Sequence, residues 1–277
     1  MPNRSPYRWS LEVVPAHAHR ATLVRGLVEE IFVTMIPGSE IKTSLAAIAS
    51  LTAQGFIPVP HIAARAFKSE AELDGFLREI EQLGVRKALL LAGGTSQSAG
   101  PFAQTLDLLQ SKAFARTSLS VIGLAGHPEG NPDDPHSRQS LEKKVQFLRT
   151  AKLGLEIITQ WSFSPQPVSA FLMALRTSGL TETVAVGVAG PASLKTLLKY
   201  AQTCGVTASM DFMGKHGLSL SRLLMPNKPE LFVHAVEGTD RFHLYPFGGL
   251  EQSAAWLESL KVMHDRPRVT ASPRESA

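Results

Sequence analysis

Eight short apolar segments, each followed by a longer stretch of helical periodicity, run through most of this 277-residue chain and restrict its possible folds. The segments are rich in β-branched residues and apolar on both faces, which is typical of parallel strands covered by helices. They lie near residues 9–14, 31–36, 56–60, 87–92, 119–125, 156–161, 183–188 and 241–246. Eight such units in about 250 residues predict a single-domain α/β fold, the (β/α)8 TIM barrel.

The intervening segments are predicted as helices, most clearly over 70–83, 140–151, 193–203 and 251–263. Ser69, followed three residues later by Glu72, predicts a helix N-cap. The long interval 189–240 predicts an additional helix near 218–224 and leaves room for a lid. We expect the catalytic barrel to span 1–263, and residues 264–277, rich in Pro, Arg and Ser, to form a flexible tail.

The main alternative is a doubly wound open sheet, which usually carries a glycine-rich fingerprint after its first strand. Here that strand runs into Val13-Val-Pro-Ala-His17, and the Gly93-Gly94 pair after the fourth strand does not form such a fingerprint. Because the carboxyl ends of all barrel strands face one mouth, the barrel also predicts where the chemistry lies.

Composition excludes several classes of partner. The net charge is +4, and the basic residues are scattered without aromatic platforms, so no nucleic-acid groove is predicted, although an anionic small ligand is compatible. No apolar run approaches the ~20 residues of a membrane span, and the N-terminus lacks an apolar signal core. The single cysteine, Cys204, excludes an internal disulfide and fits a reducing, cytoplasmic compartment; we expect a buried structural thiol at a helix end. The oligomeric state, including a homo-oligomer, stays open.

Five polar side chains interrupt the apolar strands near their carboxyl ends. They are Glu12, His61, His127, Glu129 and Gln160. A polar group in an apolar strand is costly to bury unless it is paired, so we expect these residues to converge on a common pocket. The spacing of His, Asp and Glu over 127–136 matches no standard zinc motif, so no metal site is predicted.

A series of short segments at the strand ends carries a family resemblance in both order and spacing. They are Ser10-Leu-Glu-Val-Val-Pro15, Pro60-His61, Gly126-His-Pro-Glu-Gly-Asn-Pro132, Ile158-Thr-Gln-Trp161 with Phe163, Val188-Ala-Gly-Pro-Ala-Ser193 and Phe242-His-Leu-Tyr245. From about residue 9 to residue 260 the chain resembles the methylenetetrahydrofolate reductase family, in its short form with only the catalytic barrel.

The resemblance implies an oxidoreductase that converts 5,10-methylenetetrahydrofolate to 5-methyltetrahydrofolate, or runs in reverse. In most members FAD carries hydride from NAD(P)H to the folate. The resemblance assigns Glu12 to catalysis and implies a tetrahydrofolate-type ligand. The ligand contacts that the resemblance implies are Gln160, Phe163, Leu194 and Tyr245.

The chain departs from the family where flavin binds. Ala92 stands at the arginine that meets the cofactor phosphates, and Gly94 at the aspartate beside the flavin ring. His127 and Asn131 replace a tyrosine and a histidine, and Met35-Ile-Pro-Gly38 replaces Val-Thr-Tyr-Gly. These losses favour a flavin-independent reductase in which FAD is absent and NADH gives hydride directly. The expected cofactor contacts are His61, Gly93, Gly94, His127 and Asn131.

Two further readings stay open at this point. One is an FAD-dependent reductase with a rebuilt flavin site, and the other is a non-redox folate-binding or one-carbon accessory protein. NADH is preferred to NADPH because no arginine cluster is placed to hold a 2′-phosphate. Lys143, Lys144 and Arg138, near the start of the helix after the fifth strand, are candidates for a phosphate contact, although each also fits a solvated helix face.

The proposed chemistry centres on Glu12. The methylene bridge accepts hydride only after the five-membered ring opens to an iminium ion, which requires protonation of the departing nitrogen. Burial among Leu11, Val13 and Val14 predicts a raised pKa for Glu12, so that it acts as the general acid. The alternative is a buried glutamate paired with an arginine or lysine elsewhere in the barrel. Gln160 is suited to the edge of a pterin ring, because its amide both donates and accepts.

Overall fold

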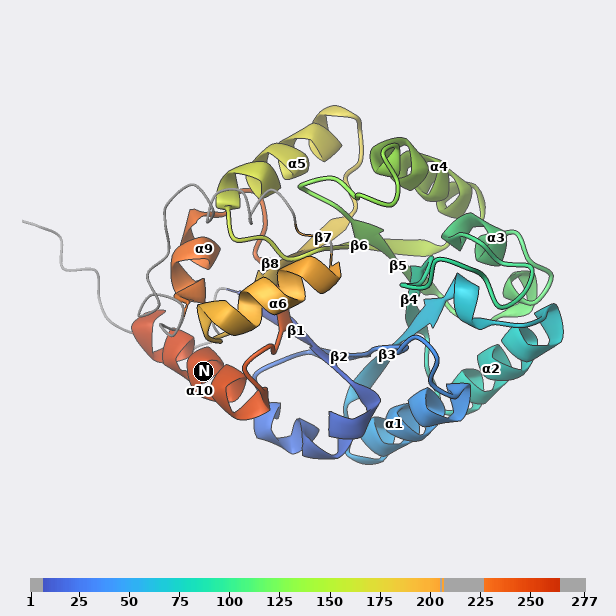
Figure 1. Cartoon of the computed structure of the whole chain (residues 1–277), viewed down its shortest axis with the longest axis horizontal. Coiled ribbons are helices and arrows are strands. Elements are labelled where there is room, and N and C mark those ends of the chain that lie inside the picture. The colour runs from blue at the N-terminus through green and yellow to red at the C-terminus, as the bar shows by residue number, and fades with distance from the viewer. Residues whose placement is uncertain (1–6, 205, 207–226, 265–277) are drawn as a thin grey trace, which may run out of the picture.

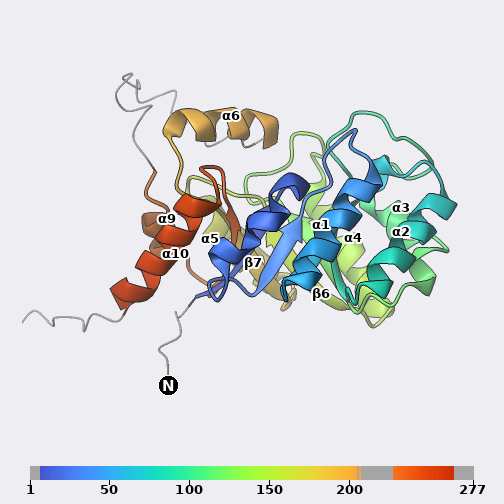
Figure 2. The same ribbon diagram turned by 90° about the horizontal axis from the view of Figure 1, so that it is seen from below.

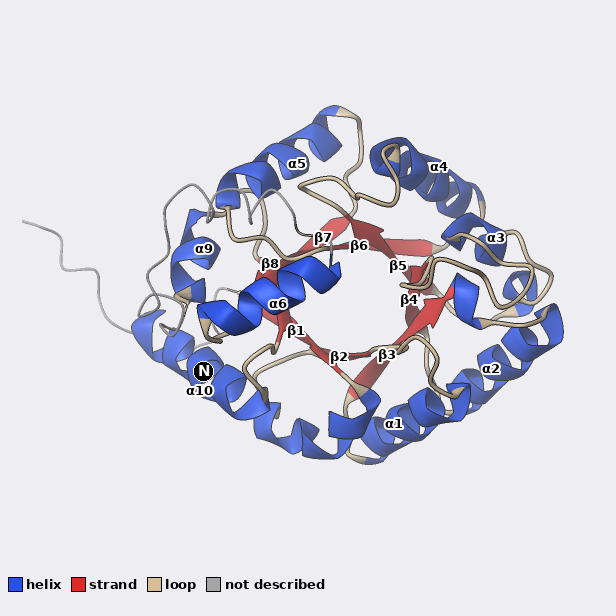
Figure 3. Cartoon of the chain, viewed as in Figure 1, coloured by secondary structure: helices blue, strands red, loops and turns tan. Residues whose placement is uncertain are grey.

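The computed structural model describes residues 7–204, 206 and 227–264, and within these ranges eight parallel strands close into a barrel. Each strand pairs with its neighbours in chain order, and β8 pairs with β1 to complete the ring (Figure 1, Figure 3). The strands are β1 (Arg8–Val13), β2 (Glu30–Val33), β3 (Ile57–Ala63), β4 (Lys87–Leu91), β5 (Val121–Gly126), β6 (Gly154–Thr159), β7 (Thr183–Ala189) and β8 (Arg241–Tyr245). The predicted (β/α)8 barrel is confirmed, with each strand within a few residues of its expected place.

Helices surround the barrel. They are α1 (Ile41–Ala53), α2 (Glu70–Gln82), α3 (Thr105–Leu109), α4 (Ser137–Thr150), α5 (Pro165–Thr177), α6 (Leu194–Cys204), α9 (Pro229–Ala235) and α10 (Leu250–His264). The link after β1 is the 3₁₀ helix η1 (Pro15–Val24), and shorter 3₁₀ turns, η2 (Ala64–Ala66) and η3 (Phe114–Arg116), follow β3 and α3. The helix expected near 218–224 and residues 265–277 of the expected tail lie outside the described residues.

Local sequence signals fix several helix ends. The Ser69 hydroxyl accepts a hydrogen bond from the Glu72 backbone N–H at 3.2 Å, and the Glu72 carboxylate accepts one from the Lys68 N–H at 2.6 Å, so the predicted cap is confirmed. The same helix ends at Gln82 and is followed by Gly84, whose φ of +79° is easily reached only without a Cβ. The Val85 N–H then bonds the Ile80 carbonyl at 3.1 Å, which closes the helix and starts the turn into β4.

The barrel separates two apolar layers. Alternate strand residues pack outward against the helices, and fully buried members of this outer core, such as Leu11, Ile62 and Leu73, each stabilise the fold by about 1.5–3 kcal/mol. A smaller cluster fills the middle of the barrel: Phe32, Val59, Leu89, Ile158 and Ala185. The interior is therefore a packed core rather than a channel, and polar interior residues lie towards its two ends.

Helix α6 lies across the carboxyl end of the barrel, whereas the other helices surround its wall (Figure 1, Figure 2). Its buried residues Leu197 and Ala201 pack with Trp161. Tyr200 stacks on Phe247, with ring centroids 4.3 Å apart. One side of the barrel mouth is therefore covered by a helix and an aromatic layer.

Two general properties follow from the described residues. None of their helices is both long enough and apolar enough to cross a membrane. No group of three or more His, Cys, Asp or Glu side chains in this part of the chain is placed to hold a metal ion.

Cys204 is the last residue of α6, as expected, and it is half-buried; burial raises the pKa of its thiol.

Candidate active site

The carboxylate of Glu12 lies between two imidazoles at the carboxyl end of the barrel. Its Oε2 is 3.4 Å from Nε2 of His61 on β3 and 3.7 Å from Nε2 of His243 on β8. Both imidazoles are buried, whereas the Glu12 side chain is 21% exposed. Within the described residues neither Nε2 atom has a hydrogen-bond partner of good geometry. Two buried nitrogens that face one accessible carboxylate are typical of a functional site rather than of a stabilised core.

The two imidazoles also determine the charge of Glu12. Burial raises the pKa of Glu12, but the neighbouring His61 and His243 outweigh burial, and the pKa of Glu12 lies below its ordinary value. Burial likewise lowers the pKa of His61, against the opposing effect of Glu12. At neutral pH the unliganded site therefore contains an ionised Glu12 beside a neutral His61. The predicted raised pKa of Glu12 is wrong, because Leu11 and Val13 face the outer core, and the neighbours that matter come from β3 and β8.

A hydroxyl fixes the orientation of His243. Ser10 Oγ lies 2.9 Å from His243 Nδ1, and the register of β8 against β1 places these two residues opposite each other. If the hydroxyl donates to Nδ1, the ring proton resides on Nε2 and faces the Glu12 carboxylate; the other tautomer would set a lone pair against the anion. Phe32 packs edge-on against this imidazole, with centroids 4.6 Å apart. The Ser10 hydroxyl and the Phe32 ring thus hold His243 in place.

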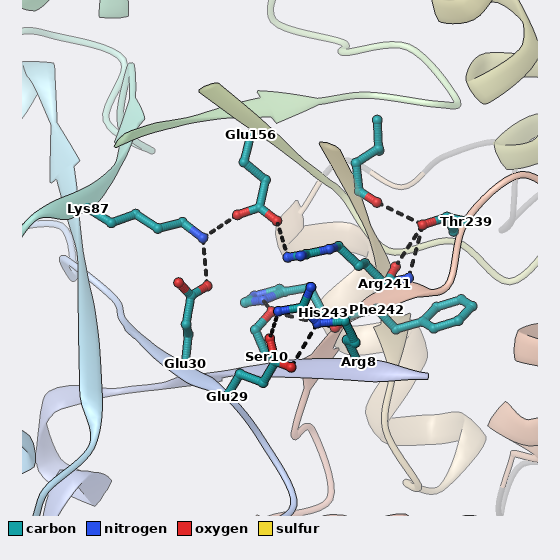
Figure 4. A network of polar contacts seen from close by, with 11 residues as sticks. Arg8, Ser10, Glu29, Glu30, Lys87, Glu156, Thr239, Arg241, Phe242 and His243 are labelled. Atoms are coloured by element: carbon teal, nitrogen blue, oxygen red, sulfur yellow. Dashed lines mark hydrogen bonds and ion pairs between the residues drawn. The ribbon is translucent and has the colours of Figure 1, made fainter. Parts of the chain in front are cut away.

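The amino end of the barrel interior holds a separate network of charges (Figure 4). Lys87 Nζ is 2.6 Å from a carboxylate oxygen of Glu30 and also bonds Glu156, which lies 3.6 Å from a guanidinium nitrogen of Arg241. The pairing with lysine or arginine considered for Glu12 is thus made by Glu30 and Glu156. In the described part of the chain, Glu12 has only imidazoles as ion-pair partners.

The residues expected to contact folate lie at the ends of β6 and β8 and at the start of α6. The Gln160 amide donates to the Cys204 carbonyl at 3.4 Å, and the Tyr245 hydroxyl donates to the Thr159 carbonyl at 3.1 Å. Burial, followed by the charges of Glu12 and Cys204, raises the pKa of Tyr245 well above its ordinary value, so its phenol stays protonated. Phe163 packs edge-on against Trp161, with centroids 5.1 Å apart, and half-buried Leu194 begins α6.

The expected cofactor contacts do not form one group. Gly93 and Gly94 line a cleft of about 970 Å³ at the β2, β3 and β4 side of the mouth. His127 and Asn131 instead line a cavity of about 30 Å³ together with Gln160, while His61 lies beside Glu12. The five polar strand-end residues accordingly fall into two sets, one around Glu12 and one around Gln160.

The second set is held together by loop contacts. Glu129 accepts a hydrogen bond from the Ser162 hydroxyl and so ties the loop after β5 to the loop after β6. Burial and the charge of Lys144 lower the pKa of His127, against an opposing effect of Asp134, so its imidazole is neutral at neutral pH. The side of the mouth that holds Gln160 is thus narrow, and the side that holds Gly93 and Gly94 is open.

Three residues of this region were not singled out for a role from the sequence: Ser10, Arg65 and Phe32. Ser10 shares the alternation that points Glu12 inward, so the two-residue period of β1 is a usable signal for it. His243 was identified from the sequence only as part of the segment Phe242-His-Leu-Tyr245, and the structure brings it beside Glu12. Arg65 follows β3 in a 3₁₀ turn and carries no periodic signal.

Comparison with known proteins supports the family and the fold. The family model described as methylenetetrahydrofolate reductase matches residues 18–216. Dihydropteroate synthase from Thermus thermophilus, in complex with 6HMPPP, is similar with a TM-score of 0.50 and 12% identity over 93% of this chain and 94% of that chain. The synthase from Xanthomonas albilineans with 4-aminobenzoic acid gives a TM-score of 0.49 and 15% identity, with 96% of each chain covered. Similarity at these identities concerns the fold alone.

The matched stretch begins after β1 and ends before β8. Glu12, His243 and Tyr245 therefore lie outside it, and their membership of the site rests on the closure of the barrel, which brings β1 and β8 side by side.

Proposed function

Because this chain belongs to the methylenetetrahydrofolate reductase family, we propose that it transfers hydride directly from NADH to 5,10-methylenetetrahydrofolate without a bound flavin. Family membership itself implies an oxidoreductase that acts on folate. The direct route, the identity of the reductant and the proton donor are the parts that we propose. NADPH is the alternative reductant, and the reverse reaction uses the same groups.

The observation that carries the proposal is the accessible Glu12 carboxyl between two buried imidazoles. A proton from Glu12 moves to the departing nitrogen of the substrate, the carbon–nitrogen bond breaks, and its electrons stay on that nitrogen. The methylene carbon becomes an iminium ion on the other nitrogen. A hydride from the reduced nicotinamide then adds to this carbon, so NADH leaves as NAD⁺ and the product carries a methyl group.

In this scheme Glu12 first donates a proton and then, as a carboxylate, stabilises the cation that forms. The Nε2–H groups of His61 and His243 stabilise the carboxylate that remains after proton transfer, and that carboxylate in turn stabilises the iminium cation. Because the pKa of Glu12 is lowered in the free site, only a small fraction is protonated at neutral pH. Folate bound over the exposed part of Glu12 removes more water from the carboxyl and so raises its pKa towards the value that proton donation requires.

The strand ends around Glu12 support the rest of the assignment. Gln160 and Tyr245 lie on the α6 side, where a pterin edge meets an amide and a phenol. On the opposite side, β4 ends in Leu91-Ala-Gly-Gly94, which offers neither a cation for the phosphates of FAD nor a carboxylate beside its ring. This residue set does not fit the flavin as the family resemblance describes it.

The test is NADH oxidation by purified protein whose absorption spectrum shows no flavin, with methylenetetrahydrofolate added and FAD withheld. Turnover with formation of 5-methyltetrahydrofolate supports direct transfer. Activity that appears only after FAD is added would contradict it and favour a rebuilt flavin site. No turnover under either condition, with folate still bound, would favour a non-redox folate-binding protein.

A further inference from the structure

Arg65 is the centre of the loop that forms one wall of the large cleft. Its backbone N–H donates to the Ala92 carbonyl at 2.9 Å, and its own carbonyl accepts from the Ala99 N–H at 2.9 Å. Its guanidinium donates through Nε to the Ala103 carbonyl at 2.9 Å and through Nη1 to the Thr95 carbonyl at 2.7 Å. The guanidinium is thereby fixed in position by backbone groups, with its Nη2 donors left over within these contacts.

Arg65 forms no ion pair with the described residues. In the described residues no carboxylate lies within ion-pair distance of it, whereas Arg138 pairs with Glu142 at 3.3 Å and Arg149 with Glu182 at 2.6 Å. The cleft also contains carboxylates of Glu40, Glu72 and Glu79, of which Glu72 is engaged by the Lys68 N–H. A preorganised, half-buried guanidinium with free donors and no counter-ion is suited to recognise an anionic ligand.

A second feature of the cleft also favours an anion. The N-terminus of α1 lines it through Glu40, Ile41 and Lys42, and no side chain caps that end of the helix. The first backbone N–H groups of a 13-residue helix and its dipole favour negative charge there. Lys42 adds a cation on the same wall.

The cleft extends to the end of β3, the strand that carries His61. Ala63, which lines it, lies two residues after His61 on β3, so both side chains point to the same face of the strand. A ligand that extends from Arg65 past Ala63 is therefore directed along β3 towards His61 and Glu12. From α1 and α2 the lining includes the apolar side chains of Leu45 and Phe76.

We propose that Arg65 binds the diphosphate of the nicotinamide dinucleotide in this cleft, with the nicotinamide directed towards Glu12 and the adenosine towards α1 and α2. The identity of the ligand rests on the proposed function. The neighbouring β4 has Ala92 where the family resemblance expects a phosphate-binding arginine. Arg65, bonded to the Ala92 carbonyl, supplies a guanidinium at that place from the adjacent strand.

The first test measures binding of ADP and of adenosine by calorimetry, because these probes differ by the diphosphate and need no catalysis. We expect the wild type to bind ADP more tightly than adenosine, and Arg65→Met to weaken ADP binding by about tenfold or more while adenosine binding changes little. The matched control is Arg176→Met, since Arg176 also donates to two loop carbonyls, of Leu180 and Glu182, but away from the cleft. Equal ADP affinity in Arg65→Met and Arg176→Met would overturn the proposal.

A second pair of variants leaves Arg65 and its hydrogen bonds in place. A change in ADP binding in these variants therefore does not come from loss of the loop structure that Arg65 holds. Gly94 lines the cleft without a positive φ, and a Cβ there would meet only the Pro37 ring at 3.5 Å, an ordinary contact. Gly94→Asp adds a negative charge to the lining, whereas Gly94→Asn adds nearly the same volume without charge. We expect ADP to bind at least tenfold more weakly to the Asp variant than to the Asn variant. Equal affinities would count against a diphosphate site.

The binding tests address the diphosphate site and the activity assay addresses the proposed reaction, so either proposal can be contradicted while the other is upheld. Arg65-dependent ADP binding in a protein that does not oxidise NADH would uphold the diphosphate site and remove the proposed reaction. NADH oxidation that is unchanged in Arg65→Met, with unchanged ADP binding, would uphold the reaction and remove this site.

Discussion

Oε2 of Glu12 lies 3.4 Å from Nε2 of His61, and this contact joins the first strand of the barrel to the third. Burial lowers the pKa of the imidazole, so a neutral ring faces an ionised carboxyl. A neutral imidazole beside a carboxylate does not form a buried ion pair, and it leaves Glu12 able to take up and release a proton when a ligand changes its surroundings.

The pH dependence of turnover separates two roles for Glu12. If Glu12 donates the proton, kcat/KM for methylenetetrahydrofolate rises as the pH falls towards the lowered pKa of Glu12, because more of the free enzyme then carries the proton. If Glu12 acts only as an anion, kcat/KM does not rise as the pH falls, because the carboxylate is already formed, and it falls only close to the lowered pKa. We expect the first result. The measurement is the initial rate of NADH oxidation between about pH 8 and pH 5, a range over which imidazole and carboxyl groups begin to take up protons.

Glu12→Gln provides the control for that profile. The amide keeps the size of the side chain and lacks the proton, so we expect kcat to fall by ~10²- to 10⁴-fold, with folate still bound and the acid limb of the profile lost. Near-normal turnover in this variant would remove Glu12 from proton transfer.

The Ser10 hydroxyl is expected to act on the reaction through His243. Ser10→Ala removes the group that fixes the Nδ1 side of the imidazole, so Nε2 faces Glu12 as a donor less often and the pKa of Glu12 rises. We expect kcat to fall by about fivefold and the acid limb to move to higher pH. Ser44→Ala is the matched control, because Ser44 is also buried and its hydroxyl has no partner in the described residues. An unshifted limb in Ser10→Ala would contradict the positioning role.

The charge network at the amino end of the barrel is expected to act on stability. Lys87→Met leaves Glu30 and Glu156 without their shared ammonium, and we expect the free energy of unfolding to drop by about 3–5 kcal/mol, measured by urea denaturation. Glu156→Gln added to this variant should recover part of the loss, since it removes the buried carboxylate. Exposed Lys143→Met should change stability by less than about 0.5 kcal/mol. A similar drop in both lysine variants would show that the network contributes nothing specific.

Local signals in the sequence predicted most of the architecture. The alternation of strands and helices put Glu12 near the carboxyl end of β1, and Ser69 marked the start of α2. The same signals did not predict the surroundings of Glu12. The apolar neighbours in sequence suggested a raised pKa, but in a strand adjacent residues point to the opposite face, and the residues that meet Glu12 come from elsewhere in the chain.

The residues expected to contact the cofactor lie in different cavities, and the sequence did not predict this separation either. His127 and Gly93 both follow strands, and the shared mouth suggested one pocket, yet the loops after β4 and β5 lead to different cavities. Loop conformation depends on contacts such as those of Arg65 with the carbonyls of Thr95 and Ala103, and no periodicity encodes them.

The sequence by itself determined eight strand–helix units and the carboxyl ends of the strands as the place of the site, because these depend on residues close to each other along the chain. The tertiary structure decided that Ser10 lies opposite His243, that Glu12 faces two imidazoles while Glu30 and Glu156 take the lysine, and that Arg65 reaches the end of β4. These relationships depend on the register in which the barrel closes, which sets distances between residues that are remote along the chain.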